Sequence, residues 1–434
     1  MGSLINEGGV MGRYGRTVPR SAPLLAAAVV LVVTACGGGD SGPTGGEPAA
    51  SAPAAETDTV TRADADLVIW ADQEQANALK AALTSFGEEE EVSTAVQVVP
   101  EGELRSAFIS ANTAGEGPDI VLGPHEWLVG MLQNGAVDPV ALSPVDQGRY
   151  VPMAMDAVTS NGQLFGLPYA FEALALYRNT DLAAAAPATF EDLVTAATSS
   201  GVEHPLCLPV GADGDAVSLQ GLYSSAGGYL FGTTAEGNHD PNDLGVGQPG
   251  SLVAAAKLSE LGASGVLKTS ITPENAVPLF SEGRCPFLVA GPDAAGDLAG
   301  VPFAVTPVPG LAGLAPARPF TVVHAFYVAS KGRSGDLAQQ FVLDAVNSPE
   351  TMRALYDAEP RPPAMTDVLA AVQAAEPAMA GLGQAAVGGQ LLPGIRQLPE
   401  VLGPLGHAEA AIISGADPAD TMRSAGRTIS DALQ

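Results

Sequence analysis

The sequence predicts an α/β fold, because short apolar strands alternate with amphipathic helices along most of the chain. The length agrees with this class, since 434 residues, 46% of them hydrophobic, supply apolar material for two ordinary domains or one very large one. The chain has only three cysteines, which are too few for a disulfide scaffold. A small disulfide-stapled fold is therefore excluded.

Residues 1–35 have the pattern of a secretory signal peptide. Three arginines precede an apolar run over residues 23–33, and this run is too short to span a bilayer. The run ends in Val33-Thr34-Ala35-Cys36, which resembles the lipobox of bacterial lipoproteins, whose cysteine thiol receives diacylglycerol. The resemblance implies that Cys36 is lipidated and anchors the mature chain to the outer face of the cell membrane. The alternative is an uncleaved anchor with an incidental cysteine.

Residues 36–64 predict a flexible tether. They consist mainly of Gly, Ser, Pro, Ala, Thr and acidic residues and include no aromatic side chain. Such a segment cannot bury enough apolar surface to offset the entropy lost on ordering. The tether would let the folded part reach a partner in the membrane.

The folded part is expected to begin at residue 65 with alternating strands and helices. Periodicity predicts strands at 66–70, 96–99 and 118–122, separated by helices at 75–86 and 103–112. Strands separated by helices imply a parallel sheet with ligand groups at the carboxyl ends of its strands. The same pattern returns later, with strands at 206–210, 286–290 and 302–308 and a helix at 252–261.

Charge and histidine content exclude two classes of function. The formal net charge is −29, so a phosphate backbone would be repelled, and nucleic-acid binding is not expected. The five histidines show no metal-ligand spacing. The sequence therefore predicts neither a metal site nor a cofactor.

Five segments in order carry a resemblance that covers nearly all of the mature chain. They are LVIWAD at 67–72, GPDIVLGPHEWLVGMLQNGAVDPV at 117–140, AVTSNGQLFGLPYAFEALALYRNTDL at 157–182, LFSEGRCPFLVAGP at 279–292 and LLPGIRQLPEV at 391–401. Together they resemble the maltose/maltodextrin-type (family 1) extracellular solute-binding lipoproteins of carbohydrate ABC importers. The resemblance implies a monomeric receptor that captures an oligosaccharide and delivers it to permease subunits, touching the membrane only through its lipid anchor.

The fold implied by this resemblance is a periplasmic-binding-protein fold, with two α/β lobes and a ligand cleft between them. Three hinge crossovers are expected near residues 171–174, 321–325 and 369–376. The N-terminal lobe would comprise residues 65–171 and 326–372, and the C-terminal lobe residues 172–325 and 373–434. Hinge closure around a ligand is a known motion of such lobes.

The residue types of a sugar site guide the choice of candidates. Carboxylate and amide side chains suit paired sugar hydroxyls, and aromatic planes pack against the C–H faces of the rings. Asp72, Gln73 and Glu74 follow the first strand, where the family places polar groups; the alternative for Asp72 is a helix N-cap. Glu126 and Trp127 follow the third strand, and Trp127 is expected to form a ring platform rather than to lie in the core.

The expected hinge supplies further candidates. Glu172 matches the family's hinge glutamate, and an acid within an apolar stretch needs a ligand or a structural partner. Tyr169 lies just before it. His324, Phe326 and Arg361 are expected where a crossover meets a lobe, with ordinary packing and a turn as the alternatives.

The chain also departs from the family pattern. Asp293 follows Gly291-Pro292 where the maltodextrin binders have a tryptophan platform, and two other expected rings are absent. A short or polar ligand is therefore favoured over a long glucan, with Asp215 and Asp293 as additional contacts. An acidic cleft also suits a cationic amino sugar, and Asp293 can equally be a helix cap.

Two questions stay open at this point. Cys207 and Cys285 are an even pair in an oxidising compartment, so they form either a disulfide or two buried thiols. The rival functions are an exported glycosidase that uses Glu126 and Glu172, for which no supporting motif exists, and a surface lipoprotein without transport. The sequence favours a binder that is not an enzyme.

Overall fold

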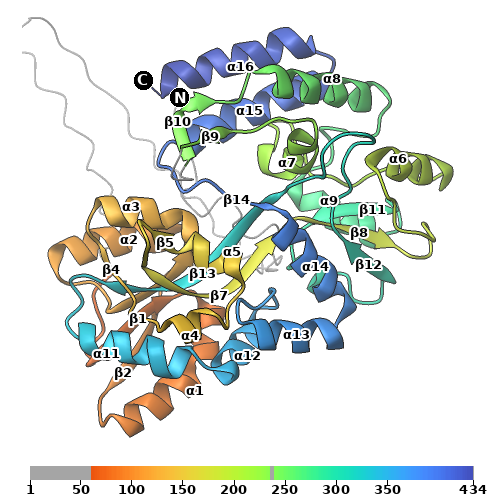
Figure 1. The fold of residues 1–434 in the computed structure, drawn as a ribbon. Helices are drawn as coiled ribbons and strands as arrows, with labels where there is room; N and C mark the ends of the chain where they lie inside the picture. Colours follow the sequence, from red (N-terminus) through yellow and green to blue (C-terminus); the bar gives the residue numbers. More distant parts are fainter. Residues whose placement is uncertain (1–59, 235–238, 434) are drawn as a thin grey trace, which may run out of the picture.

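The computed structural model describes residues 60–234 and 239–433, which form two α/β lobes (Figure 1). The predicted signal peptide, Cys36 and the tether up to residue 59 lie outside the described residues. Within the described ranges, no helix is both long and apolar enough to cross a membrane. The two-lobed fold is the one that the resemblance predicted.

The first lobe is built on a seven-stranded sheet. Its strands run in the order β14-β13-β3-β1-β2, and β4 and β7 also pair with β13. β1 is parallel to β2 and β3, as predicted, whereas β13 is antiparallel to β3, β4 and β7, so the complete sheet is mixed. The strands are β1 (Leu67–Ala71), β2 (Thr94–Val98), β3 (Ile120–Pro124), β4 (Val137–Asp138), β7 (Gly166–Ala173), β13 (Phe320–Ala329) and β14 (Gln390–Leu391).

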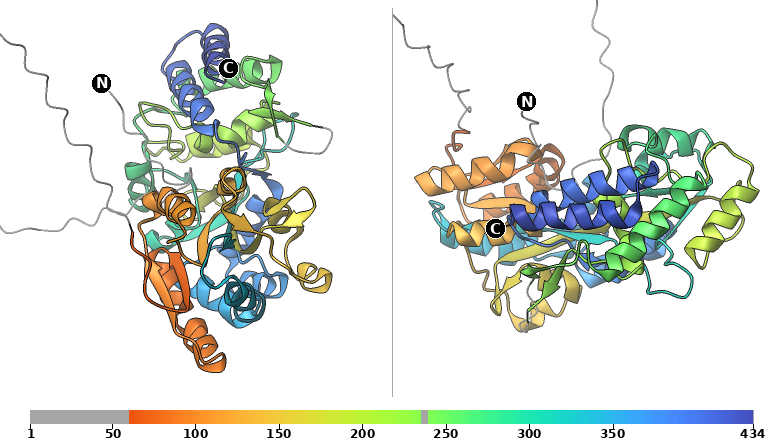
Figure 2. Two further views of the ribbon diagram at one scale, coloured as in Figure 1. Left: turned by 90° about the vertical axis from the view of Figure 1, so that its left-hand side faces the viewer. Right: turned by 90° about the horizontal axis from the view of Figure 1, so that it is seen from above.

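Helices cover this sheet, and the two views in Figure 2 show them on both of its faces. α1 begins at a capping box. The Asp72 side chain accepts a hydrogen bond from the Gln75 backbone N–H, and the Gln75 side chain accepts one from the Asp72 backbone N–H. The elements are α1 (Gln73–Glu89), α2 (Glu101–Ala114), η1 (His125–Trp127), α3 (Leu128–Gln133), α4 (Pro144–Gln147), α5 (Pro152–Ala157), α11 (Gly335–Gln340), η2 (Phe341–Val346), α12 (Pro349–Ala358) and α13 (Thr366–Ala375), with a hairpin of β5 (Thr159–Ser160) and β6 (Gln163–Leu164).

The second lobe has a three-stranded sheet in the order β11-β8-β12, and all of its pairs are antiparallel. β8 follows β7 directly and is the central strand of this sheet. The elements are β8 (Ala175–Asn179), α6 (Phe190–Ser199), α7 (Ala216–Ser225), β9 (Phe231–Thr233), β10 (His239–Leu244), α8 (Pro249–Ala263), α9 (Pro273–Ser281), β11 (Phe287–Ala290), α10 (Ala294–Asp297), β12 (Phe303–Thr306), α14 (Pro377–Gly388), α15 (Leu398–Ile413) and α16 (Pro418–Ala432).

The predicted strand at 206–210 is absent. Only Cys207 makes a bridge, to Leu288 of β11, and Pro205 and Pro209 flank it without an N–H group to donate to a ladder. The Cys207 backbone still exchanges hydrogen bonds with β11, and Cys207 is disulfide-bonded to Cys285. The segment is thus fixed to the sheet edge without being a strand.

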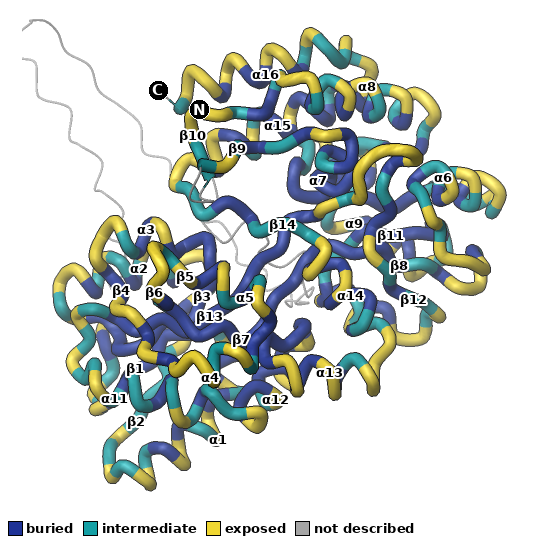
Figure 3. Tube along the Cα trace, viewed as in Figure 1, coloured by how far each residue is buried: buried dark blue, intermediate teal, exposed yellow. Residues whose placement is uncertain are grey.

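Three chain segments connect the lobes. β7 leads into β8, and β13 extends from the second lobe into the first sheet (Figure 1). The third connection passes from α13, which packs on α12, to α14, which packs on β12. Figure 3 shows that β7 and β13 are buried along their lengths, since every residue of both strands is buried. These two strands are the shared support of the candidate site.

The folded part begins earlier than the sequence predicted. Arg62, assigned to the tether, is buried, and its Nη2 lies 2.8 Å from Oδ2 of the fully buried Asp119. The same carboxylate accepts from the backbone N–H groups of Val68 and Ser334. Residues 60–64 therefore belong to the folded body, because this buried ion pair joins them to the first lobe.

Candidate functional site

Three candidate residues meet where β7, β13 and the loop after α12 come together. Glu172 lies on β7, His324 on β13, and Arg361 on the loop. His324 Nε2 is 2.8 Å from Glu172 Oε1, and Arg361 Nε donates to Glu172 Oε2 over 3.0 Å. All three side chains are buried, so these contacts are screened little by solvent.

The charges in this cluster are strongly coupled. Burial alone would raise the pKa of Glu172, but Arg361 and the hydrogen bond with His324 outweigh it and lower the pKa to about 2. Arg361 also contacts Glu359, and its Nη2 lies 3.9 Å from Asp293 Oδ1. The sequence left a ligand contact and a structural hinge pair open for Glu172, and this geometry favours the structural pair.

His125 joins the end of β3 to β13 and to the segment that follows β14. Its Nδ1 accepts from the Val323 backbone, and Nε2 donates to the Leu392 carbonyl, each over 3.1 Å. Burial lowers the pKa of His125 to about 4. Protonation would also remove the acceptor that Val323 needs, so His125 is a neutral ring at physiological pH.

Glu126 is the buried acid without a partner in this region. Its side chain is 8% exposed, and neither carboxylate oxygen accepts a hydrogen bond from the described residues. His125 Nδ1 lies 3.7 Å away but is already occupied, so it cannot act as the counter-cation. Burial raises the pKa of Glu126 to about 7, because its own backbone N–H and the interactions with His324 and Arg105 offset only part of the lost hydration.

The segment that shields Glu126 leads from β14 into α15. A Cβ added to Gly394 would lie 3.4 Å from the Glu126 Cα, so this segment packs against the backbone of Glu126. An added Cβ at 394 would therefore make only ordinary van der Waals contacts there.

Tyr169 and Phe326 pack beside the cluster. Their rings are 5.4 Å apart in an edge-to-face arrangement, and the Tyr169 ring lies 6.0 Å from that of His324. The Tyr169 hydroxyl accepts from Gln75 Nε2 over 2.9 Å. Phe326 is fully buried, so its candidacy as a ligand contact was wrong and the packing alternative holds.

The other polar candidates have local roles. Asp72 is the N-cap of α1, which was its alternative, and the exposed Gln73 bonds to Asn77 on the same helix. Glu74 is half-buried in the first turn of that helix. Asp215 caps α7 in the second lobe, where it accepts from the Val217 and Ser218 backbones. The presence of Asp72 and Asp215 is thus explained by helix capping, without a ligand.

Trp127 is not an exposed ring platform. It is 2% exposed and belongs to the hydrophobic core. A Cβ on Gly123 would lie 2.3 Å from the indole ring, so the ring packs flat against the backbone of β3. The expected platform is corrected to a core side chain.

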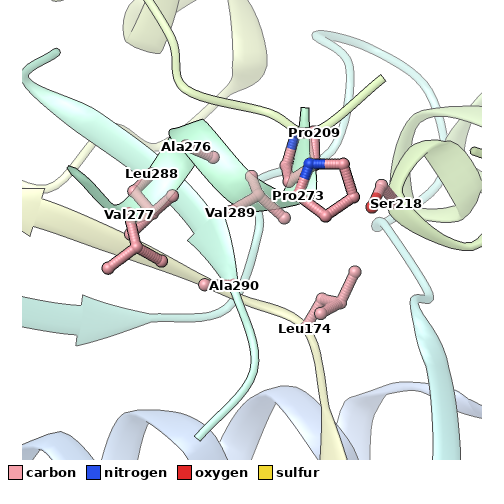
Figure 4. Close-up of a pocket in the computed structure, with 9 residues that line it drawn as sticks. All are labelled: Leu174, Pro209, Ser218, Pro273, Ala276, Val277, Leu288, Val289 and Ala290. Atoms are coloured by element: carbon pink, nitrogen blue, oxygen red, sulfur yellow. The ribbon is translucent and has the colours of Figure 1, made fainter. Parts of the chain in front are cut away.

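Figure 4 shows a small apolar cavity in the second lobe, between β11, α9 and the start of α7. Its volume is about 20 Å³, which holds one water molecule but no sugar ring. In the described ranges, no three His, Cys, Asp or Glu side chains converge as metal ligands would. The cluster around Glu126 and Glu172 therefore remains the candidate site.

Sequence reasoning missed three residues that the structure adds to this site. They are His125, Gln75 and Glu359, each buried and each in contact with a predicted residue. A signal existed for His125, which is one of five histidines and adjoins Glu126. Glu359 lies two residues before Arg361 in an otherwise apolar turn, and Gln75 is the capping-box partner of Asp72.

Comparison with known proteins assigns the family. A family model described as bacterial extracellular solute-binding protein matches residues 81–381. The chain belongs to the bacterial extracellular solute-binding protein family. As a member of this extracellular family, it acts outside the cytoplasm.

Relatives of this solute-binding protein have named ligands. It is 24% identical over 426 residues to the galactooligosaccharide-binding protein of Bacillus subtilis (strain 168), covering 93% of this chain and 95% of the relative. It is 25% identical over 330 residues to the maltotriose-binding protein of Pyrococcus abyssi, covering 73% and 70% of the two chains. Its fold matches a crystal structure of a cyclo/maltodextrin-binding protein complexed with maltotetraose, with a TM-score of 0.77 and 23% identity over 86% of this chain and 98% of that one.

Proposed function

We propose that this solute-binding protein captures a short neutral oligosaccharide between its lobes and delivers it to an ABC permease. The proposal includes lipid anchoring through Cys36 and hinge motion about the three connecting segments. It divides the lobes at the predicted boundaries, with residues 60–64 added to the first lobe, and assigns no chemical step to the protein. The relatives named for galacto- and maltooligosaccharides support a carbohydrate ligand.

The observation that carries the proposal is the buried carboxyl of Glu126. A carboxylate that gives up water needs donors, and the described residues supply none. A sugar offers adjacent hydroxyl donors that can pair with both oxygens. Glu126 lies beside the neutral His125, which is hydrogen-bonded to β13, and close enough to His324 and Glu172 to interact with them electrostatically. A ligand bound there would contact both lobes.

A second candidate is an amino sugar. An ammonium group would donate hydrogen bonds to the Glu126 carboxylate and would also neutralise its charge. Acidic side chains outnumber Arg361 in the neighbouring cluster, which contains Glu172, Glu359 and Asp293. Anionic sugars would be repelled under either candidate.

The test is a thermal-shift screen followed by titration calorimetry on the mature chain. The panel contains galactooligosaccharides, maltooligosaccharides, amino sugars and the matching uronates. We expect a neutral oligosaccharide to raise the melting temperature. A preference for the amino sugars would replace the first candidate by the second, and release of smaller sugars would instead identify an enzyme.

The site itself is tested with Glu126→Gln. Replacing the carboxylate should weaken the best ligand by about 1–3 kcal/mol, because a buried charged hydrogen bond is lost. Glu88→Gln, an exposed acid at the end of α1, is the matched control and should bind as the wild type does. Equal affinity of all three proteins would reject Glu126 as a ligand contact.

A further inference from the structure

The guanidinium of Arg361 is held rigidly on the first lobe. The loop that carries it lies along β7, where the Phe171 backbone donates to the Pro362 carbonyl and the Ala364 backbone donates to the Tyr169 carbonyl, each over 2.9 Å. Nε is bonded to Glu172, and Nη1 contacts Glu359. Because a guanidinium is planar, these two contacts fix the direction of its third nitrogen, Nη2.

Nη2 points at a carboxylate of the second lobe. Asp293 follows β11, and the Tyr177 hydroxyl of β8 fixes the start of its turn by donating to the Gly291 carbonyl over 2.7 Å. Asp293 occupies the N-cap position of α10 but makes no capping hydrogen bond, and its Oδ1 lies 3.9 Å from Nη2. Asp293 thus faces Arg361 across the two lobes.

Charge explains why such a contact matters here. Acidic side chains outnumber basic ones in both lobes, so their mutual repulsion increases as the lobes approach. The Arg361 side chain is 7% exposed and that of Asp293 is 40% exposed. Arg361 is therefore shielded from water whereas Asp293 is partly solvated, so added salt should weaken the attraction between them.

We propose that Arg361 and Asp293 are a positioning pair, which holds the lobes in the arrangement seen here and thereby favours ligand capture at Glu126. Neither residue needs to touch the ligand. In this arrangement Glu126 is shielded from water, and hydrogen bonds to a shielded carboxylate are stronger. The effect on ligand affinity rests on the proposed function, whereas the effect on lobe arrangement does not.

The experiment compares Asp293→Asn with Asp297→Asn, a matched control on α10 that removes the same charge from an exposed side chain. Small-angle X-ray scattering of the sugar-free mature protein measures the separation of the lobes. Measurements at about 0.01 M and about 1 M salt separate a screened pair from a packing effect. Asp293→Glu keeps the charge and tests rescue.

At low salt, we expect Asp293→Asn to increase the radius of gyration, and Asp297→Asn and Asp293→Glu to match the wild type. High salt screens both the pair and the mutual repulsion of the lobes, so it should remove the difference between the wild type and Asp293→Asn. For the best sugar of the screen, Asp293→Asn should weaken affinity about two- to fivefold at low salt, in the range of a partly exposed pair.

Two results would overturn the proposal. The first is scattering of Asp293→Asn that superimposes on both the wild type and the control at low salt. The second is weaker sugar binding with unchanged scattering, which would make Asp293 a direct ligand contact. If no carbohydrate binds, the proposed function fails, but the scattering still decides whether the pair holds the lobes.

Discussion

The disulfide between Cys207 and Cys285 gives a stability prediction that follows directly from the structure. We consider replacing both cysteines with alanine. Both residues are fully buried, and they lie 78 positions apart in the sequence. The cross-link therefore closes a long loop in the unfolded chain.

The magnitude comes from the entropy of that loop. Closing about 78 residues lowers the entropy of the unfolded chain by about 15 cal/mol/K, or about 4.5 kcal/mol at 25 °C. The native state keeps its backbone pairing without the bond, since Cys207 N donates to Phe287 O and Val289 N donates to Cys207 O. We therefore expect the variant to fold but to lose about 3–4.5 kcal/mol of stability.

The assay is equilibrium denaturation in urea, followed by tryptophan fluorescence and circular dichroism. The wild type treated with a reductant after unfolding should match the double-alanine variant, and the reductant should leave that variant unchanged. Cys36 is replaced by alanine in every sample, so that it cannot form mixed disulfides. A loss below about 1 kcal/mol would refute the loop-entropy reasoning.

Four further predictions concern single groups. Burial raises the pKa of Glu126 to about 7, and hydrogen bonds from sugar hydroxyls favour its ionised form. Calorimetry should therefore find the highest affinity for the sugar above pH 7 and a lower affinity below it. The affinity of Glu126→Gln should depend little on pH. The pKa of Glu172 is about 2 in the folded chain and about 4.3 in the unfolded chain. Ionised Glu172 therefore adds about 3 kcal/mol to the free energy of unfolding above pH 4.3, and this stabilisation is lost as the pH falls toward 2. Acid denaturation of Glu172→Gln should not show this loss of stability. A chain that begins at Ala65 should be about 3 kcal/mol less stable in urea than one that begins at Val60, because it leaves Asp119 buried without Arg62. Burial, and to a lesser extent the charge of Asp215, raises the pKa of Glu409 in the folded chain. As the pH increases, Glu409 therefore ionises first in the unfolded chain, which lowers the free energy of unfolding. Glu409→Gln should melt at a higher temperature than the wild type at pH 7, and the two melting temperatures should converge below about pH 4.

Local features of the fold were predictable because their causes are local. The helix predicted at 75–86 is α1, and its start is set by Asp72 and Gln75, three residues apart. The strand at 206–210 failed for an equally local reason, because two prolines interrupt an apolar run that otherwise has strand composition. Apolar periodicity reports burial, but hydrogen-bonding capacity decides between a strand and an extended segment.

Roles within the site depend on partners far away in the sequence, so the residue type alone could not assign them. Glu172 could be selected as an acid in an apolar strand, but its partners are 152 and 189 positions distant. Trp127 was expected to be a platform because its neighbours are polar, yet its ring lies on Gly123. The same contrast separates the two glutamates: Glu172 has two partners and a lowered pKa, whereas Glu126 has none and a raised one. Glu409 is likewise buried without donors, so burial alone does not identify a ligand contact. The proposal for Glu126 therefore depends on its place beside His125, which is hydrogen-bonded to β13.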